Sequence, residues 1–248
     1  MRADTPKQLQ RCIDSACADF GGQVHVFFRD DDVAVPGSQF EKMMRLFGEF
    51  GVPLCPALVP SWLTTSRWRR FGELFDPSSS LWCWHQHGWR HVDHEKAGKK
   101  QEFGPSRSDA RLTRDLRKGR ARLEDIVGKH FYPVFTPPWN RCSGAALKII
   151  KDLGYKAVSR TRGAPPPGVD LKDVAVDVDL HTRKDTDGRT GWNTLLQEFE
   201  TGIGTGRCGI MLHHRHMHAA AFDFLEMLLK IMVAHPHIRL VNFRDLLE

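Results

Sequence analysis

The sequence has no apolar run of the roughly 18 to 20 residues that a membrane span requires. Its first twenty residues are polar and lack the apolar core of a signal peptide, which predicts a cytoplasmic protein unless a leader peptide has been removed. The six cysteines form no CxxC pair, so neither a cysteine zinc site nor a thioredoxin-type redox motif is indicated. Free, buried thiols are therefore expected.

Several catalytic and binding motifs are also missing. The GxSxG elbow of serine hydrolases does not occur. The glycine-rich segment 202–206 precedes a predicted strand and has no Walker lysine, which argues against nucleotide binding. The basic stripe from Arg107 to Arg122 has helical spacing and is interpreted as a solvated helix face, so no nucleic-acid partner is predicted.

The composition is that of a globular protein, with 248 residues of which 41% are hydrophobic and 27% charged. Because no repeat or low-complexity linker divides the chain, we expect one domain over residues 1–248, with residues 1–20 as an N-terminal helical extension. Strand-like and amphipathic runs alternate, which predicts an α/β fold: a distorted (β/α) barrel of seven or eight parallel strands. The expected strands are 23–29, 52–59, 80–85, 133–135, 155–159, 173–178, 207–213 and 237–241, and the expected helices are 6–19, 37–50, 106–127, 143–153 and 218–233.

Histidine is abundant, with thirteen residues that cluster at 85–94 and 213–218. His87 and His91 are four residues apart, and a helical turn with this spacing would point both imidazoles to one side. Two histidines so placed are what a metal site with a histidine pair requires. The cluster follows a predicted strand, and the long segment 86–105 after it is a candidate functional loop.

A run of three aspartates, Asp30 to Asp32, ends the first apolar strand. Adjacent carboxylates repel one another, so positive groups are expected to offset them. One interpretation is a solvated turn. The functional alternative places one carboxylate on a metal ion and uses its neighbour as a base.

Three more polar segments follow predicted strands. Trp139 in segment 135–141 offers a flat face that could stack on a sugar ring or pack in the core, segment 176–181 is acidic, and His213 ends the strand at 207–213. In a barrel the carboxyl ends of the strands carry the active site, so we expect these segments to meet there. One aspartate and two histidines would then form a catalytic zinc site with an open position for water.

The order and placement of these segments resemble the five short motifs of the polysaccharide deacetylase family, carbohydrate esterase family 4, over residues 23–243. The first family motif pairs a base aspartate with a metal-ligand aspartate, which correspond to Asp31 and Asp32. The second contains two metal-ligand histidines, which correspond to His87 and His91. The fifth ends in a general-acid histidine, which corresponds to His213.

The third motif departs from the family pattern. Residues 136–140 read TPPWN, so Thr136 stands where the family has the arginine that orients the base. Arg29, Arg107 or Arg141 could take that place, and the sequence does not choose among them.

The fourth motif is aspartate-rich in the family and matches residues 177–179 loosely, without its usual tryptophan. By the resemblance, the expected substrate-binding residues are Pro138, Trp139, Asn140, Asp179 and His181.

The resemblance implies a metal-dependent hydrolase that removes an N-acyl group, expected to be N-acetyl, from a sugar or sugar conjugate. Asp32, His87 and His91 would hold a divalent ion, with Zn²⁺ as the first choice and Co²⁺, Ni²⁺ or Mn²⁺ as alternatives. Asp31 would take a proton from the attacking water, and His213 would protonate the departing amine.

Two other functions fit the same residues. One is hydrolysis of another amide, such as a formyl or cyclic amide, and the other is a non-catalytic carbohydrate-binding barrel, which the altered third motif suggests. Most relatives act on wall polymers outside the cytoplasm, so the missing export signal favours a soluble or carrier-linked substrate. The net charge of +6 favours a phosphorylated or nucleotide-linked sugar. No oligomeric state is predicted.

Overall fold

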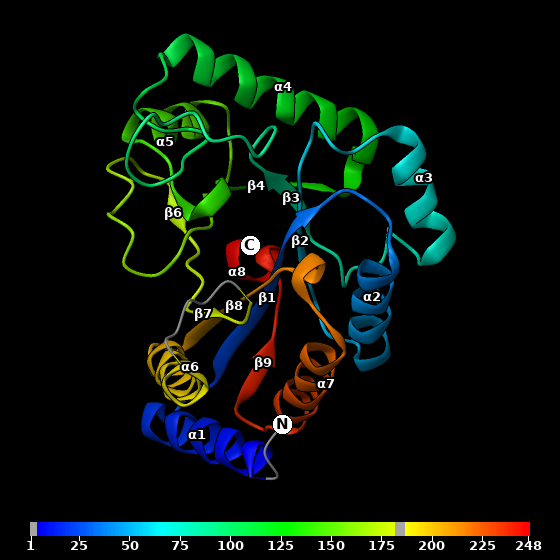
Figure 1. Cartoon of the computed structure of the whole chain (residues 1–248), viewed down its shortest axis with the longest axis vertical. Coiled ribbons are helices and arrows are strands. Elements are labelled where there is room, and N and C mark those ends of the chain that lie inside the picture. Colours follow the sequence, from blue (N-terminus) through cyan, green and yellow to red (C-terminus); the bar gives the residue numbers. More distant parts are fainter. Residues whose placement is uncertain (1–3, 182–186) are drawn as a thin grey trace.

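A curved, all-parallel sheet is the centre of the computed structural model, which describes residues 4–181 and 187–248 (Figure 1). Its strands follow the order β6-β5-β4-β3-β2-β1-β8-β7, and β9 pairs with the first half of β1. No pairing joins β6 to β7 in the described ranges, so the barrel stays open there and the predicted distorted (β/α) barrel is confirmed. The strands are β1 (Val24–Val33), β2 (Cys55–Leu58), β3 (Trp84–His87), β4 (Phe131–Thr136), β5 (Ala157–Val158), β6 (Lys172–Asp173), β7 (Val178–Asp179), β8 (Arg207–Leu212) and β9 (Ile238–Leu240).

Helices cover the outer face of the sheet (Figure 1). In α2, Phe40, Met43 and Phe47 recur at helical spacing and are buried, as an amphipathic helix requires. The N-terminal helix α1 buries Leu9 and Ile13 and packs on α6, so it is part of the core. No helix in the described chain is long and apolar enough to cross a membrane. The helices are α1 (Thr5–Phe20), α2 (Ser38–Phe50), α3 (Thr65–Leu74), α4 (Asp109–Val127), α5 (Gly144–Asp152), α6 (Gly188–Ile203), α7 (Ala219–Ala234) and α8 (Phe243–Leu247).

Some predicted elements are wrong. The expected strand 173–178 is two short strands, β6 and β7, which pair with β5 and β8 at opposite edges of the sheet. The expected strand 80–85 begins instead at Trp84 and extends to His87. The sequence pattern also does not predict α3, α6 or α8, because α3 is mostly polar and α6 begins among glycines and polar residues.

The interior of the curved sheet changes from apolar to polar along β1. Phe27 belongs to an inner apolar cluster that Phe243 of α8 closes, with the two ring centroids 5.3 Å apart. Figure 1 shows α8 and the C-terminus in the middle of the curved sheet. Because successive side chains of a strand alternate between faces, Arg29 and Asp31 follow Phe27 on this inner face. The polar residues at the carboxyl end of β1 thus follow directly on the inner apolar cluster. The six cysteines are free, as expected, and all but Cys142 are buried.

Candidate active site

The aspartates at the end of β1 point to different partners. Asp30 faces the helix layer, where its carboxylate accepts hydrogen bonds from the backbone N–H (2.9 Å) and Nδ1 (2.7 Å) of His214. Asp31 faces the interior and forms a two-pronged ion pair with Arg29, from Nε to Oδ1 (2.8 Å) and from Nη2 to Oδ2 (2.9 Å). Both carboxylates are buried, so the run is not a solvated turn, and separate donors offset its charges.

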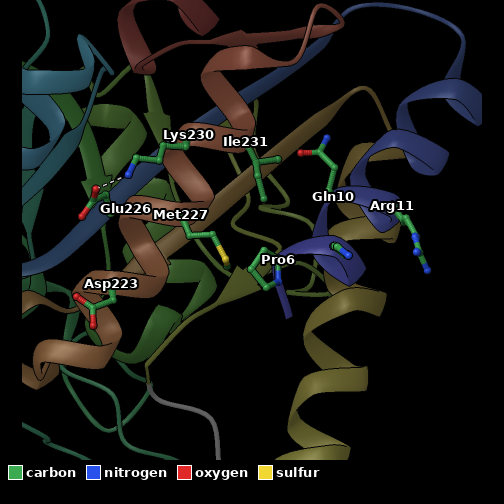
Figure 2. A pocket seen from close by; sticks show the side chains of 9 residues that line it. Pro6, Gln10, Arg11, Asp223, Glu226, Met227, Lys230 and Ile231 are labelled. Atoms are coloured by element: carbon green, nitrogen blue, oxygen red, sulfur yellow. Dashed lines mark hydrogen bonds and ion pairs between the residues drawn. The ribbon is translucent and has the colours of Figure 1, made fainter. Parts of the chain in front are cut away.

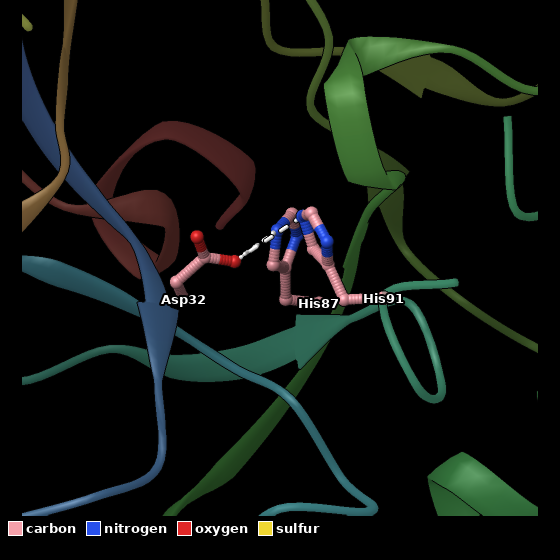
Figure 3. Close-up of side chains that lie close together, drawn as sticks. All are labelled: Asp32, His87 and His91. Atoms are coloured by element: carbon pink, nitrogen blue, oxygen red, sulfur yellow. Dashed lines mark ion pairs between the residues drawn. The ribbon is translucent and has the colours of Figure 1, made fainter. Parts of the chain in front are cut away.

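Asp32, His87 and His91 form the group in the described chain that could hold a metal ion (Figure 3). The Nε2 atoms of His87 and His91 lie 3.4 Å and 3.3 Å from Oδ1 of Asp32. A tetrahedral zinc ion with bonds of about 2.0 to 2.1 Å needs ligand atoms about 3.4 Å apart, so the spacing fits. The buried Oδ1 of Asp32 has no hydrogen-bond partner among the described residues, as expected of an atom that a cation would contact.

The orientation of His87 is fixed by a hydrogen bond at the ring nitrogen that does not face Asp32. Its Nδ1 donates to the carbonyl oxygen of Thr136 (3.0 Å), which leaves Nε2 free to face Asp32. The hydroxyl of Thr136 instead contacts Nε2 of His85 (2.9 Å), and burial lowers the pKa of His85 to about 3. Burial opposes ionisation of Asp32, but the close contact with His87 and the charges of His91 and His213 outweigh it, so the pKa of Asp32 is lowered. The carboxylate is therefore anionic, as a metal ligand must be.

His91 lies on a loop with left-handed residues after β3. The helical turn expected from the spacing of His87 and His91 is wrong. Gly88 (φ 57°) and His91 (φ 59°) both have left-handed backbone conformations. Gly88 is required here, because a Cβ atom would lie 2.3 Å from Oε2 of Glu102. The buried carboxylate of Glu102 accepts hydrogen bonds from the three consecutive N–H groups of Trp89 (3.1 Å), Arg90 (2.6 Å) and His91 (3.2 Å). Glu102, which sequence reasoning missed, thus holds the loop that carries His91.

Replacing Glu102 with alanine is expected to lower metal affinity by about 10- to 100-fold, the usual cost of removing a group that orients a ligand. The three loop N–H groups would lose their acceptor, and His91 its fixed position. Competition with a chromophoric chelator would measure the affinity. Glu95→Ala is the matched control, because Glu95 accepts from Ser106 and does not contact the His91 backbone. If Glu102→Ala does not fold, Glu102→Gln is the second variant, because it keeps the side-chain volume. An unchanged metal affinity in a folded variant would contradict the role of Glu102 in holding the His91 loop.

Of the three candidate arginines, Arg29 forms the ion pair with Asp31. Besides Asp31, the fully buried Arg29 donates to the carbonyl (3.1 Å) and hydroxyl (2.9 Å) of Ser159 and to Oδ1 of Asn140 (2.7 Å). Arg107 pairs instead with Asp115. Burial raises the pKa of Asp31, but the charges of Arg29 and two nearby histidines outweigh it, so the net shift is downward.

A cleft of about 720 Å³ opens over these groups. Of the predicted substrate-binding residues, Trp139, Asn140 and Asp179 line it together with Asp31, His213 and the metal triad. Pro138 does not line it and is buried against Gly88. His181 lies in a neighbouring hollow beside Leu180 and Trp192. The roles of these residues in substrate binding stay predictions.

His213, the expected general acid, faces the cleft just beyond β8. Its buried Nδ1 has no hydrogen-bond partner in the described part of the chain, and the ring centroid of His216 lies 6.0 Å away. Asp177 of the fourth motif pairs with Arg162 and accepts the N–H of Gly209 (2.7 Å). The role of His213 as a general acid stays a prediction.

Backbone strain is concentrated at this cleft. In the described ranges, the non-glycine residues with positive φ are Asp32, His91, Trp139 and Asn140, and all four line the cleft. Each such conformation costs on the order of 1 to 3 kcal/mol and persists where the surrounding structure imposes it, typically at functional sites.

A second hollow of about 700 Å³ lies between α1 and α7 (Figure 2). Its walls include Pro6, Met227 and Ile231, and two of its charged residues, Glu226 and Lys230, pair with each other at 2.5 Å. No strand end or histidine contributes to it, so it offers no comparable chemistry.

No protein-family model matches the chain, and no curated protein sequence matches it. Solved structures do match. A T48 deacetylase with substrate has a TM-score of 0.58 at 15% identity, covering 93% of this chain and 92% of that one. A family 4 acetyl xylan esterase from Clostridium thermocellum, in complex with a cobalt ion, has a TM-score of 0.52 at 14% identity, covering 90% and 89%. The peptidoglycan deacetylase PdaC from Bacillus subtilis has a TM-score of 0.52 at 12% identity, covering 90% of both chains. Together with the strand order and the curved parallel sheet, these similarities show that the chain has the fold of the polysaccharide deacetylases.

Proposed function

We propose that this protein is a metal-dependent hydrolase that removes an N-acetyl group from a sugar or sugar conjugate. The observation that carries the proposal is the convergence of an Asp-His-His triad, a clamped aspartate and a histidine on one cleft. The same fold supports deacetylation in the structures named above, and one of them contains a cobalt ion.

Asp32, His87 and His91 would hold the ion, for which zinc is the first choice and cobalt, nickel or manganese are alternatives. When bound, a divalent ion supplies Lewis-acid activation of water and of the amide carbonyl.

The chain's own residues supply the proton transfers. A carboxylate oxygen of Asp31 accepts a proton from the water whose oxygen adds to the carbonyl carbon. Arg29 holds this carboxylate in one orientation with two charge-assisted hydrogen bonds, which are shorter and stronger than neutral ones. Nε2 of His213 gives a proton to the nitrogen as the C–N bond breaks, so the products are acetate and an amine.

The position of Arg29 argues against the alternative of a non-catalytic carbohydrate-binding barrel. That alternative was suggested by the threonine in place of the third-motif arginine, and Arg29 supplies a guanidinium to Asp31 from within β1. Hydrolysis of a formyl or cyclic amide would use the same groups, so only a comparison of substrates distinguishes it from deacetylation.

Elemental analysis of the purified protein, together with amine release from N-acetyl, N-formyl and cyclic amide substrates, tests the proposal. We expect about one divalent ion per chain in a three-ligand site of this kind. N-acetylated sugars should release amine and acetate in equal amounts, a chelator should stop the release, and added Zn²⁺ should restore it. Metal-loaded protein that cleaves only formyl or cyclic amides, or no amide, would reject deacetylation.

A further inference from the structure

We propose that one wall of the cleft, formed by Lys99, Lys100 and Arg141 and named here the basic wall, binds a phosphate group carried by the sugar substrate. All three residues line the same cleft as Asp32 and His91. The inference rests on the proposed function, because it places the phosphate on the molecule whose amide is cleaved.

Two ring contacts place Lys100 of the basic wall near the metal site. The ring of Trp139 lies 4.5 Å from the ring of the metal-site residue His91, measured between centroids. Nζ of Lys100 lies 6.0 Å from the centroid of Trp139. The ring of Trp139 thus contacts both the Lys100 ammonium and His91 of the metal site. A sugar stacked on Trp139 could present its amide to the metal site and a phosphate to Lys100.

The cations of the basic wall form no ion pair with any described residue. Acidic residues on the same loop are engaged elsewhere: Asp93 accepts the N–H groups of Glu95 and Gln101 (3.0 Å each), and Glu95 accepts from Ser106. Asp93 is close enough to Lys100 for their charges to interact, but the two form no ion pair.

The cleft is also lined by the acidic residues Asp177, Asp179 and Glu198, of which Asp177 pairs with Arg162. Three cations suit a phosphate ester, which carries close to two negative charges at neutral pH and three acceptor oxygens. A carboxylate offers a single charge, so it is the weaker match.

The test compares N-acetylglucosamine with its 1-phosphate and its 6-phosphate on the metal-loaded protein. We expect kcat/KM for at least one phosphate to exceed that for the neutral sugar by about tenfold, the combined effect of three solvent-exposed charge pairs. The preference should shrink as ionic strength rises. N-acetylmuramic acid serves as the carboxylate probe.

The triple variant Lys99→Gln, Lys100→Gln and Arg141→Gln should abolish the preference and keep activity on the neutral sugar. A control with the same change in net charge shows whether overall charge explains the effect, and it should retain the preference. Its three exposed substitutions, which lie away from the cleft, are Arg69→Gln, Lys118→Gln and Lys148→Gln.

Binding without turnover separates this inference from the proposed function. Glucose 6-phosphate and glucose 1-phosphate have no amide, and calorimetry should show that at least one binds more tightly than glucose to the metal-loaded protein, but not to the triple variant. Equal binding of the three, or a phosphate preference that survives in the triple variant, would overturn the basic wall even if deacetylation holds. Selective gain with the carboxylate probe alone would overturn the assignment to phosphate.

Discussion

Replacing His87 with alanine is expected to remove the metal ion and the amidase activity together. Nε2 of His87 lies 3.4 Å from Oδ1 of Asp32, and the Thr136 carbonyl holds the ring in this orientation. The variant would leave two protein ligands where a catalytic site needs three. The loss of metal affinity should exceed the roughly 100-fold that loss of an orienting group costs. Elemental analysis and amine release on the same preparation measure both effects.

His94→Ala is the matched control, because His94 belongs to the same histidine cluster but is exposed and outside the triad. It should keep both metal and activity. Full metal occupancy in His87→Ala would exclude His87 as a ligand, and the proposed site with it.

Replacing Asp31 with asparagine should lower kcat by about 10²- to 10⁴-fold while the metal stays bound, because the substitution removes a base and keeps its shape. Asp31 is held by Arg29 and lies outside the triad, so metal content and activity should separate in this variant. Steady-state amine release and elemental analysis show whether they do.

The neighbouring substitution Asp30→Asn tests whether position matters more than charge in the aspartate run. Asp30 faces the helix layer and contacts His214, so this variant should keep most of its activity. It should lose about 1 to 3 kcal/mol of unfolding free energy, because a buried hydrogen-bond partner is changed. If Asp30→Asn lost activity as fully as Asp31→Asn, the family alignment would be shifted by one residue.

Much of the site could be predicted because it depends on a general property of parallel sheets. The carboxyl ends of the strands meet at one edge, so Asp32, His87 and His213 approach one another wherever the strands are placed in the right order. The alternation of apolar and amphipathic runs predicts the parallel sheet in which this convergence occurs. Errors of a few residues at strand ends, as in β3, do not disturb this convergence.

The rest depends on contacts that no local pattern contains. The loop carrying His91 is shaped by Gly88 and Glu102, whose carboxylate binds N–H groups more than ten residues away in sequence. The arginine that holds Asp31 lies on the same strand, two residues before it, where the sequence offers three candidates without a preference. Strands β6 and β7 are too short for periodicity to detect, because two residues cannot show an alternation.

The separate partners of the aspartate run also have a consequence for how the chain acquires activity. Asp30 contacts His214 across 184 positions of sequence, and Arg29 contacts Ser159 across 130. Such contacts require segments far apart in the sequence to come together, while a helix needs only neighbouring residues. We therefore expect recovered turnover after dilution from denaturant to report complete refolding more stringently than recovered helix content.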